Sequence, residues 1–146
     1  MRCVIQRIKK ASVSVKGNIV SSVEKGLLIL LAVASDDTEN DAVKTAKKIS
    51  DLRIFSNKEG KFDHSVKEIN GEILLVSQFT LYGDASKGRR PDFSYAADHG
   101  KANMLYEKTK EELIKEGLKV KTGVFAAEME VNLINDGPVT VIYDTK

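Results

Sequence analysis

The stretch Gly26-Leu27-Leu28-Ile29-Leu30-Leu31-Ala32-Val33 decides the fold, because every position from Leu27 onward is apolar. A strand with one face in water alternates apolar and polar side chains, whereas a strand covered on both faces reads as a continuous apolar run. Residues 27–33 are therefore predicted to form the central, fully buried strand of the domain. The longest apolar run, Leu27 to Ala34, is too short to cross a bilayer.

The sequence on either side of the central strand predicts further strands and two helices. Thr38 and Asp41 are spaced like a capping box, with apolar residues at helical spacing after them, so a helix should begin there. A second helix should stop at Gly117. We expect strands at 1–15, 19–23, 27–33, 53–55, 72–78, 118–124, 128–135 and 139–143, and helices at 38–52 and about 96–116.

The composition is that of one globular domain spanning residues 1–146. Apolar residues make up 42% and charged residues 30%, and the net charge is only +2. A strongly charged nucleic-acid or membrane binder is therefore not implied, although a local basic patch is not excluded. Together with the periodicity, this composition predicts a strand-rich α/β domain with two helices.

The cysteine count and the N-terminal residues restrict the chemistry and the compartment. Cys3 is the only cysteine, which excludes an internal disulfide and leaves too few thiolates for a cysteine-built zinc site. It lies in an apolar strand, so we predict a buried small hydrophobe rather than a nucleophile. No signal-peptide core fits the N-terminal residues, and we expect a cytosolic protein without a membrane segment.

A standard catalytic constellation is not found in the sequence. His64 and His99 are the only histidines, and neither has a metal-ligand spacing. Both are interpreted as exposed loop residues rather than catalytic bases. There is also no nucleophile elbow, phosphate loop or dinucleotide-binding glycine motif.

Two polar segments remain as candidate sites. Ser77-Gln78-Phe79-Thr80-Leu81 interrupts an apolar strand at its end, where sites collect in α/β domains. The same residues could simply cap their own backbone, and the sequence leaves both interpretations open. Asn135-Asp136-Gly137-Pro138-Val139-Thr140 contains strong turn formers, so on its own it favours a hairpin turn.

Together, these two segments resemble the D-aminoacyl-tRNA deacylase family. The first matches the family's S-Q-F-T-L motif and the second its N-x-G-P-V-T motif. Arg90-Pro91-Asp92-Phe93-Ser94 resembles the R-P-x-F-S loop, and residues 122–129 resemble the T-G-x-F-x-A-x-M segment. The order and spacing of the motifs extend the resemblance over the whole chain.

The resemblance implies a homodimeric hydrolase with no metal or organic cofactor and a mixed or antiparallel sheet, or a barrel-like core. Such an enzyme cleaves the ester between a D-amino acid and the terminal adenosine of tRNA, removes misattached glycine and spares L-aminoacyl-tRNA. A cis Gly137–Pro138 pair is implied to enter the partner's pocket, where its carbonyl oxygens orient the substrate amino group and exclude an L side chain.

The resemblance also assigns site residues. The implied catalytic group is Ser77, Gln78, Phe79 through its backbone N–H, and Thr80, since fixed N–H groups stabilise an oxyanion. Arg7 is implied to hold the Gly-Pro motif, although alone it would be interpreted as a surface charge on an edge strand. The other implied substrate-binding residues are Gly137, Pro138, Phe125 and Met129. Lys87, Arg89 and Arg90, in a loop without periodicity at 82–91, are expected to contact tRNA phosphates.

Three alternatives stay open. Thr80 could be a covalent nucleophile, although no His or Lys partner is evident by spacing. The chain could bind nucleic acid without hydrolysing it, using the same basic loop. It could also be a purely structural dimer with neither activity.

Overall fold

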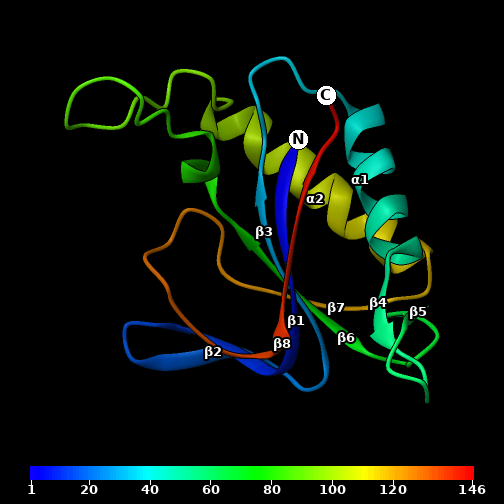
Figure 1. The fold of residues 1–146 in the computed structure, drawn as a ribbon. Coiled ribbons are helices and arrows are strands. Elements are labelled where there is room, and N and C mark those ends of the chain that lie inside the picture. The colour runs from blue at the N-terminus through cyan, green and yellow to red at the C-terminus, as the bar shows by residue number, and fades with distance from the viewer.

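The computed structural model describes residues 1–146 and contains one six-stranded mixed sheet, a two-stranded hairpin and two helices (Figure 1). The sheet order is β2-β1-β3-β6-β7, and β8 pairs with the other edge of β1. The elements are β1 (Arg2–Val15), β2 (Asn18–Val23), β3 (Gly26–Ala32), α1 (Glu39–Asp51), β4 (Arg53–Ser56), β5 (Phe62–Ser65), β6 (Glu72–Ser77), a 3₁₀ turn (Phe79–Tyr82), α2 (His99–Lys115), β7 (Lys119–Thr122) and β8 (Glu130–Asp144).

Strand β3 is central and buried on both faces, as its sequence predicts. Leu27, Ile29 and Leu31 belong to the larger core cluster, which also contains residues of both helices. Leu28 points to the opposite face, into a second cluster with Leu74 and others. The strand is antiparallel to β1 and parallel to β6. The continuous apolar run thus serves two separate cores.

The two helices pack against each other and cover one face of the sheet (Figure 1). The predicted capping box of α1 is present, with the Asp41 carboxylate accepting hydrogen bonds from the backbone N–H and hydroxyl of Thr38 at 2.9 and 2.8 Å. Helix α2 begins at His99, later than the predicted Ala96, because Asp98 accepts from the Lys101 N–H and caps the helix there.

The sheet curves until its ends nearly meet, which gives the barrel-like core that the family resemblance implies. Strands β2 and β7 come together through two hydrogen bonds, both 2.6 Å long. The Ser21 hydroxyl donates to the carbonyl oxygen of Thr122, and the Lys121 ammonium donates to that of Ser22. The prediction of a strand-rich α/β fold with two helices is confirmed.

The hairpin expected around residues 136–138 is absent, and that prediction is wrong. Residues 130–144 form one strand, β8, paired with β1 from Ser14↔Glu130 to Arg2↔Asp144. The register shifts beside Ile8, which accommodates the Gly137–Pro138 segment without reversing the chain. The Gly137–Pro138 peptide bond is cis.

Smaller differences concern element ends. Strand β5 was not anticipated, and β7 is shorter than the predicted 118–124. The apolar strand of the first motif ends at Ser77, and the residues that follow form the 3₁₀ turn. Neither helix has the length and apolar character that crossing a bilayer requires.

Candidate active site

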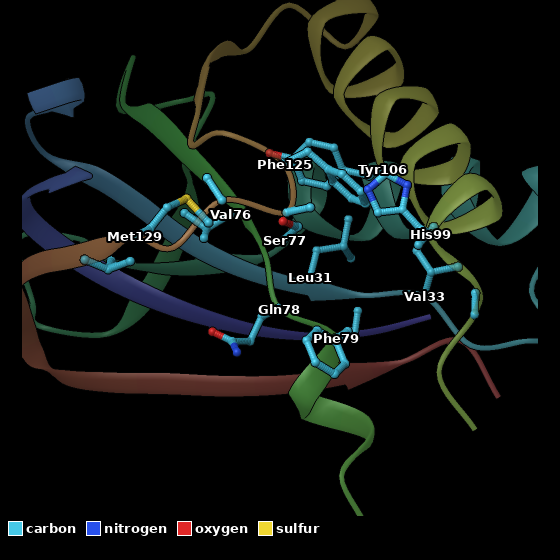
Figure 2. A pocket seen from close by; sticks show the side chains of 16 residues that line it. Leu31, Val33, Val76, Ser77, Gln78, Phe79, His99, Tyr106, Phe125 and Met129 are labelled. Atoms are coloured by element: carbon cyan, nitrogen blue, oxygen red, sulfur yellow. The ribbon is translucent and has the colours of Figure 1, made fainter. Parts of the chain in front are cut away.

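A mostly apolar cavity of about 480 Å³ opens beside the carboxyl ends of the parallel strands β3 and β6 (Figure 2). Side chains at this edge of a sheet converge, so it is a common place for a site. The lining residues come from the ends of β3 and β6 with the residues that follow them, from the start of α2, and from the segment that leads into β8. They are Leu31, Ala32, Val33, Val76, Ser77, Gln78, Phe79, Ala97, His99, Ala102, Tyr106, Phe125, Ala126, Ala127, Met129 and Val131.

The first motif lies at the mouth of this cavity. The Gln78 N–H donates to the carbonyl oxygen of Leu31 at 2.8 Å, which holds the end of β6 against β3. The 3₁₀ turn then begins, and the first N–H groups of a helical turn have no acceptor within it. Ser77, Gln78 and Phe79 line the cavity, whereas exposed Thr80 does not and accepts a hydrogen bond from the Gln78 amide.

The wall opposite the motif is built from aromatic rings. Phe125 and Met129, both implied by the resemblance, line the cavity together with Tyr106. The Tyr106 hydroxyl donates to the carbonyl oxygen of Leu75 at 2.8 Å, and burial raises its pKa, so it stays neutral. The Phe125 ring lies 5.6 Å from the Tyr106 ring, centroid to centroid. The wall is therefore anchored in the core.

The second motif lies outside the cavity of its own chain. Gly137 and Pro138 are exposed, and neither lines the cavity. Arg7 is buried beside them: its Nε donates to the carbonyl oxygen of Asp136 at 2.8 Å, and its Nη1 donates to that of Ile54 at 2.6 Å. The interpretation of Arg7 as a surface charge on an edge strand is wrong, because β1 has partners on both edges.

The basic loop follows the first motif directly. Lys87, Arg89 and Arg90 are exposed and do not line the cavity. The base of the loop is closed by backbone hydrogen bonds between Asp84 and Asp92 at 2.8 and 2.9 Å. Phe93, just past this closure, packs edge-on against Phe79 at 5.2 Å. The loop is thus attached to the rim of the cavity.

The interpretation of both histidines as exposed loop residues is wrong. His64 is half-buried in β5, and His99 is an exposed residue of the first turn of α2 that also lines the cavity. No spacing signal in the sequence could have found His99, because its neighbours in the cavity come from distant segments. Burial raises the pKa of the Cys3 thiol to about 12, in agreement with a buried structural residue.

Solved structures of two proteins share this fold over nearly the whole chain. One, described as a c-Myc DNA unwinding element binding protein, has a TM-score of 0.93 and 38% sequence identity, covering 100% of this chain and 99% of the other. The second, described as a probable eukaryotic D-amino acid tRNA deacylase, has a TM-score of 0.86 and covers 97% of each chain. At 17% identity, the second likeness concerns the fold alone.

Sequence relatives are closer. The D-aminoacyl-tRNA deacylase of Caldicellulosiruptor saccharolyticus is 54% identical, covering 100% of this chain and 98% of its own length. A Bacillus cereus protein of the same name is 53% identical over the full length of both chains. The family model for D-Tyr-tRNA(Tyr) deacylase matches residues 4–144. The match over nearly the whole chain and the identities above 50% show that the chain belongs to the D-Tyr-tRNA(Tyr) deacylase family.

Proposed function

We propose that this protein hydrolyses the ester bond of D-aminoacyl-tRNA, releasing the D-amino acid and tRNA. The observation that carries the proposal is the first motif, Ser77-Gln78-Phe79-Thr80, at the mouth of a cavity lined by aromatic rings. The cavity volume of about 480 Å³ lies within the range of small-ligand pockets and suits a terminal adenosine with its amino acid. Such pockets are mostly apolar and hold a few convergent polar groups, as this cavity does. Family membership at above 50% identity supports the same reaction.

The chemistry needs little from side chains, because an aminoacyl ester is already activated. Water adds to the ester carbonyl, the bond to the ribose oxygen breaks, and a proton passes to that oxygen. The backbone N–H groups at the start of the 3₁₀ turn, at Phe79 above all, would stabilise the oxyanion, with Ser77 and Gln78 beside them. The neighbouring ribose 2′-hydroxyl would help to activate the water.

A covalent route through Thr80 has less support. Its hydroxyl accepts a hydrogen bond from Gln78 and lies outside the cavity lining, and no hydrogen bond joins it to a His or Lys side chain. A nucleophilic threonine needs such a base to remove its proton. No aminoacyl ester on Thr80 should therefore accumulate during turnover.

The proposal extends to a two-fold dimer in which each subunit completes the pocket of the other. The Gly137–Pro138 segment is exposed and held by Arg7, yet it does not reach the cavity of its own chain. Strand β8 also presents exposed Leu133, Ile134 and Ile142, which a second copy could cover. Reciprocal contacts in such a dimer would create two equivalent sites.

Chiral selection would follow from that arrangement. The backbone of Gly137–Pro138 would face the substrate amino group, and an L side chain would collide with it. Glycine has no side chain to collide, so glycyl-tRNA should also be cleaved.

The proposed substrate also bears on the location of the enzyme. We expect the enzyme to act in the cytoplasm, because aminoacyl-tRNA is used there.

Deacylation of matched substrates tests the proposed function. We expect D-Tyr-tRNA and Gly-tRNA to be hydrolysed and L-Tyr-tRNA to be spared, with a D/L rate ratio of at least about 100, which corresponds to about 2.7 kcal/mol of discrimination. The measurement is release of labelled amino acid under single-turnover conditions. A Ser77→Ala/Gln78→Ala double variant is the negative control, because it removes both motif side chains and keeps the backbone N–H that bonds the end of β6 to Leu31.

A second candidate function is nucleic-acid binding without hydrolysis. The description of the 38%-identical solved structure names a DNA-binding protein, and the basic loop here is exposed. The same assay separates the candidates. Binding of tRNA without release of amino acid from either the D or the L substrate would favour a binding module. Neither binding of tRNA nor release of amino acid would favour a structural dimer.

The basic loop is proposed to hold the acceptor end of tRNA. Changing Lys87, Arg89 and Arg90 together to glutamine should raise KM for D-Tyr-tRNA about tenfold at low salt and leave kcat within about twofold, because phosphate contacts supply mainly salt-dependent affinity. The dependence of KM on salt should also become weaker. KM is measured at a series of salt concentrations between about 50 and 300 mM, which spans roughly the range over which phosphate contacts weaken.

The control for charge alone replaces Lys16, Lys44 and Lys58 by glutamine. These exposed lysines lie on other parts of the surface, and the change in net charge is the same. If both triple variants behave alike, or if neither changes KM, the loop does not contact tRNA.

A further inference from the structure

His99 is a polar side chain of the cavity that the proposed chemistry does not use. Thirteen of the sixteen lining residues are hydrophobic, and the other three are Ser77, Gln78 and His99. The first two belong to the catalytic motif at the end of β6, whereas His99 comes from α2. Figure 2 shows its imidazole directed from the start of the helix toward the rings of Tyr106 and Phe125.

The imidazole is held in place although it is exposed. Its ring lies 5.1 Å from the Phe125 ring, centroid to centroid, at 80°. Phe125 in turn packs on Tyr106, which is 2% exposed and hydrogen-bonded to the core. The cap formed by Asp98 also fixes the backbone of the first helical turn. Three rings therefore extend from the core to the cavity rim, with His99 outermost.

The ring nitrogens of His99 are free to bind a ligand. The polar contacts around this first turn join Asp98 to the Lys101 N–H and the Lys101 ammonium to the Ser35 carbonyl oxygen, and none involves the imidazole. A neutral imidazole offers one donor and one acceptor. A positioned ring with both groups unpaired, on the rim of an apolar cavity, is suited to a flat ligand with a polar edge.

We propose that His99 binds the terminal adenine of the tRNA, with the imidazole hydrogen-bonding to the edge of the base; this rests on the proposed function. The apolar part of the cavity can cover the faces of a base, but it leaves the edge nitrogens without partners, and burying them unpaired is costly. Unpaired nucleotides are commonly recognised by ring contacts combined with hydrogen bonds to the base edge. His99 supplies the hydrogen bond that the hydrophobic lining lacks.

The test uses a non-hydrolysable probe, D-tyrosine joined by an amide to 3′-amino-3′-deoxyadenosine, and D-Tyr-tRNA turnover. His99→Phe keeps a ring and removes the hydrogen bond, so the Kd of the probe and KM should each rise about fivefold, with kcat within about twofold. His99→Ala should raise both constants about tenfold. His64→Ala, which changes the other histidine in β5, should leave both constants unchanged.

Probe analogues locate the contact on the base. Analogues lacking the 6-amino group or the N7 nitrogen are measured with wild type and His99→Phe. One of these deletions should weaken wild-type binding about fivefold and leave the variant unaffected, since the variant has already lost that bond. The proposal would be overturned if, for both analogues, the loss of affinity caused by the analogue simply added to the loss caused by His99→Phe.

Other outcomes are also decisive. Wild-type affinity in His99→Phe would exclude the hydrogen bond, and a lower kcat with unchanged KM would assign His99 to the reaction instead. Each of these overturns the proposal while D-specific deacylation stands. If wild type neither binds the probe nor cleaves D-Tyr-tRNA, the proposed function fails rather than the role of His99.

Discussion

Replacing Gly137 by alanine should lower kcat/KM for D-Tyr-tRNA at least about 100-fold, because displacements near 1 Å at a site can cost that much. Gly137 has φ +146°, a conformation that side chains rarely adopt. An added Cβ would lie 2.6 Å from Cγ2 of Val139 and 3.2 Å from Nη2 of Arg7. The motif or the guanidinium that holds it must therefore move. Single-turnover deacylation measures the loss.

The fold of this variant should survive, because Gly137 is exposed. Thermal unfolding checks this expectation. Gly60→Ala is the matched control: Gly60 also has positive φ, +77°, and its added Cβ meets nothing within 4 Å. Full activity in Gly137→Ala would show that the second motif is not part of the site.

Mixing defective subunits tests whether two chains share each pocket. Gly137→Ala subunits combined with equal amounts of Ser77→Ala/Gln78→Ala subunits should regain about a quarter of wild-type activity, since half of the dimers are mixed and each has one intact pocket. Each variant alone should keep no more than about a hundredth of wild-type activity. No recovery after verified subunit exchange would contradict the shared pocket.

Replacing Gly26 by alanine should destabilise the protein by about 3 kcal/mol or more, a large part of the 5–15 kcal/mol typical of a whole domain. An added Cβ would lie 1.8 Å from the backbone oxygen of Glu72 and 2.7 Å from its nitrogen. Gly26 and Glu72 are register partners of the parallel pair β3 and β6, so the two backbones would have to separate.

Urea unfolding measures this effect as the change in free energy of unfolding. Gly17→Ala is the control, because Gly17 lies in a turn where an added Cβ meets nothing within 4 Å. Alanine in the left-handed conformation of Gly17, with φ +78°, should cost only about 1–2 kcal/mol. Equal unfolding midpoints for Gly26→Ala and wild type would show that the strands separate at little cost.

The sequence predicted the elements whose signal is local. The apolar run of β3 and the capping box of α1 depend on neighbouring residues, and both are present. The prediction of a hairpin turn within β8 was wrong, because Asp-Gly-Pro favours a turn when only its neighbours are considered. Pairing with β1 over nearly its whole length outweighs that preference and keeps β8 continuous.

The site was predictable to the extent that it resembled known motifs. Ser77 and Gln78 were found by their motif, and the structure places them at the cavity. His99 could not be found, because its significance depends on Phe125, 26 positions later, meeting it across the cavity. The burial of Arg7 could not be found either, since it depends on β8 covering the second edge of β1.

The pairing of β1 with β8 also determines the order in which the domain can fold. Strand β1 can pair with β2 and β3 soon after synthesis, because these partners are close in sequence. Its other edge has to wait until β8 has been made, since Arg2 pairs with Asp144. Such non-local pairing has a high contact order and slows folding. The nascent chain therefore carries an open strand edge for most of its synthesis, when it is most prone to aggregate.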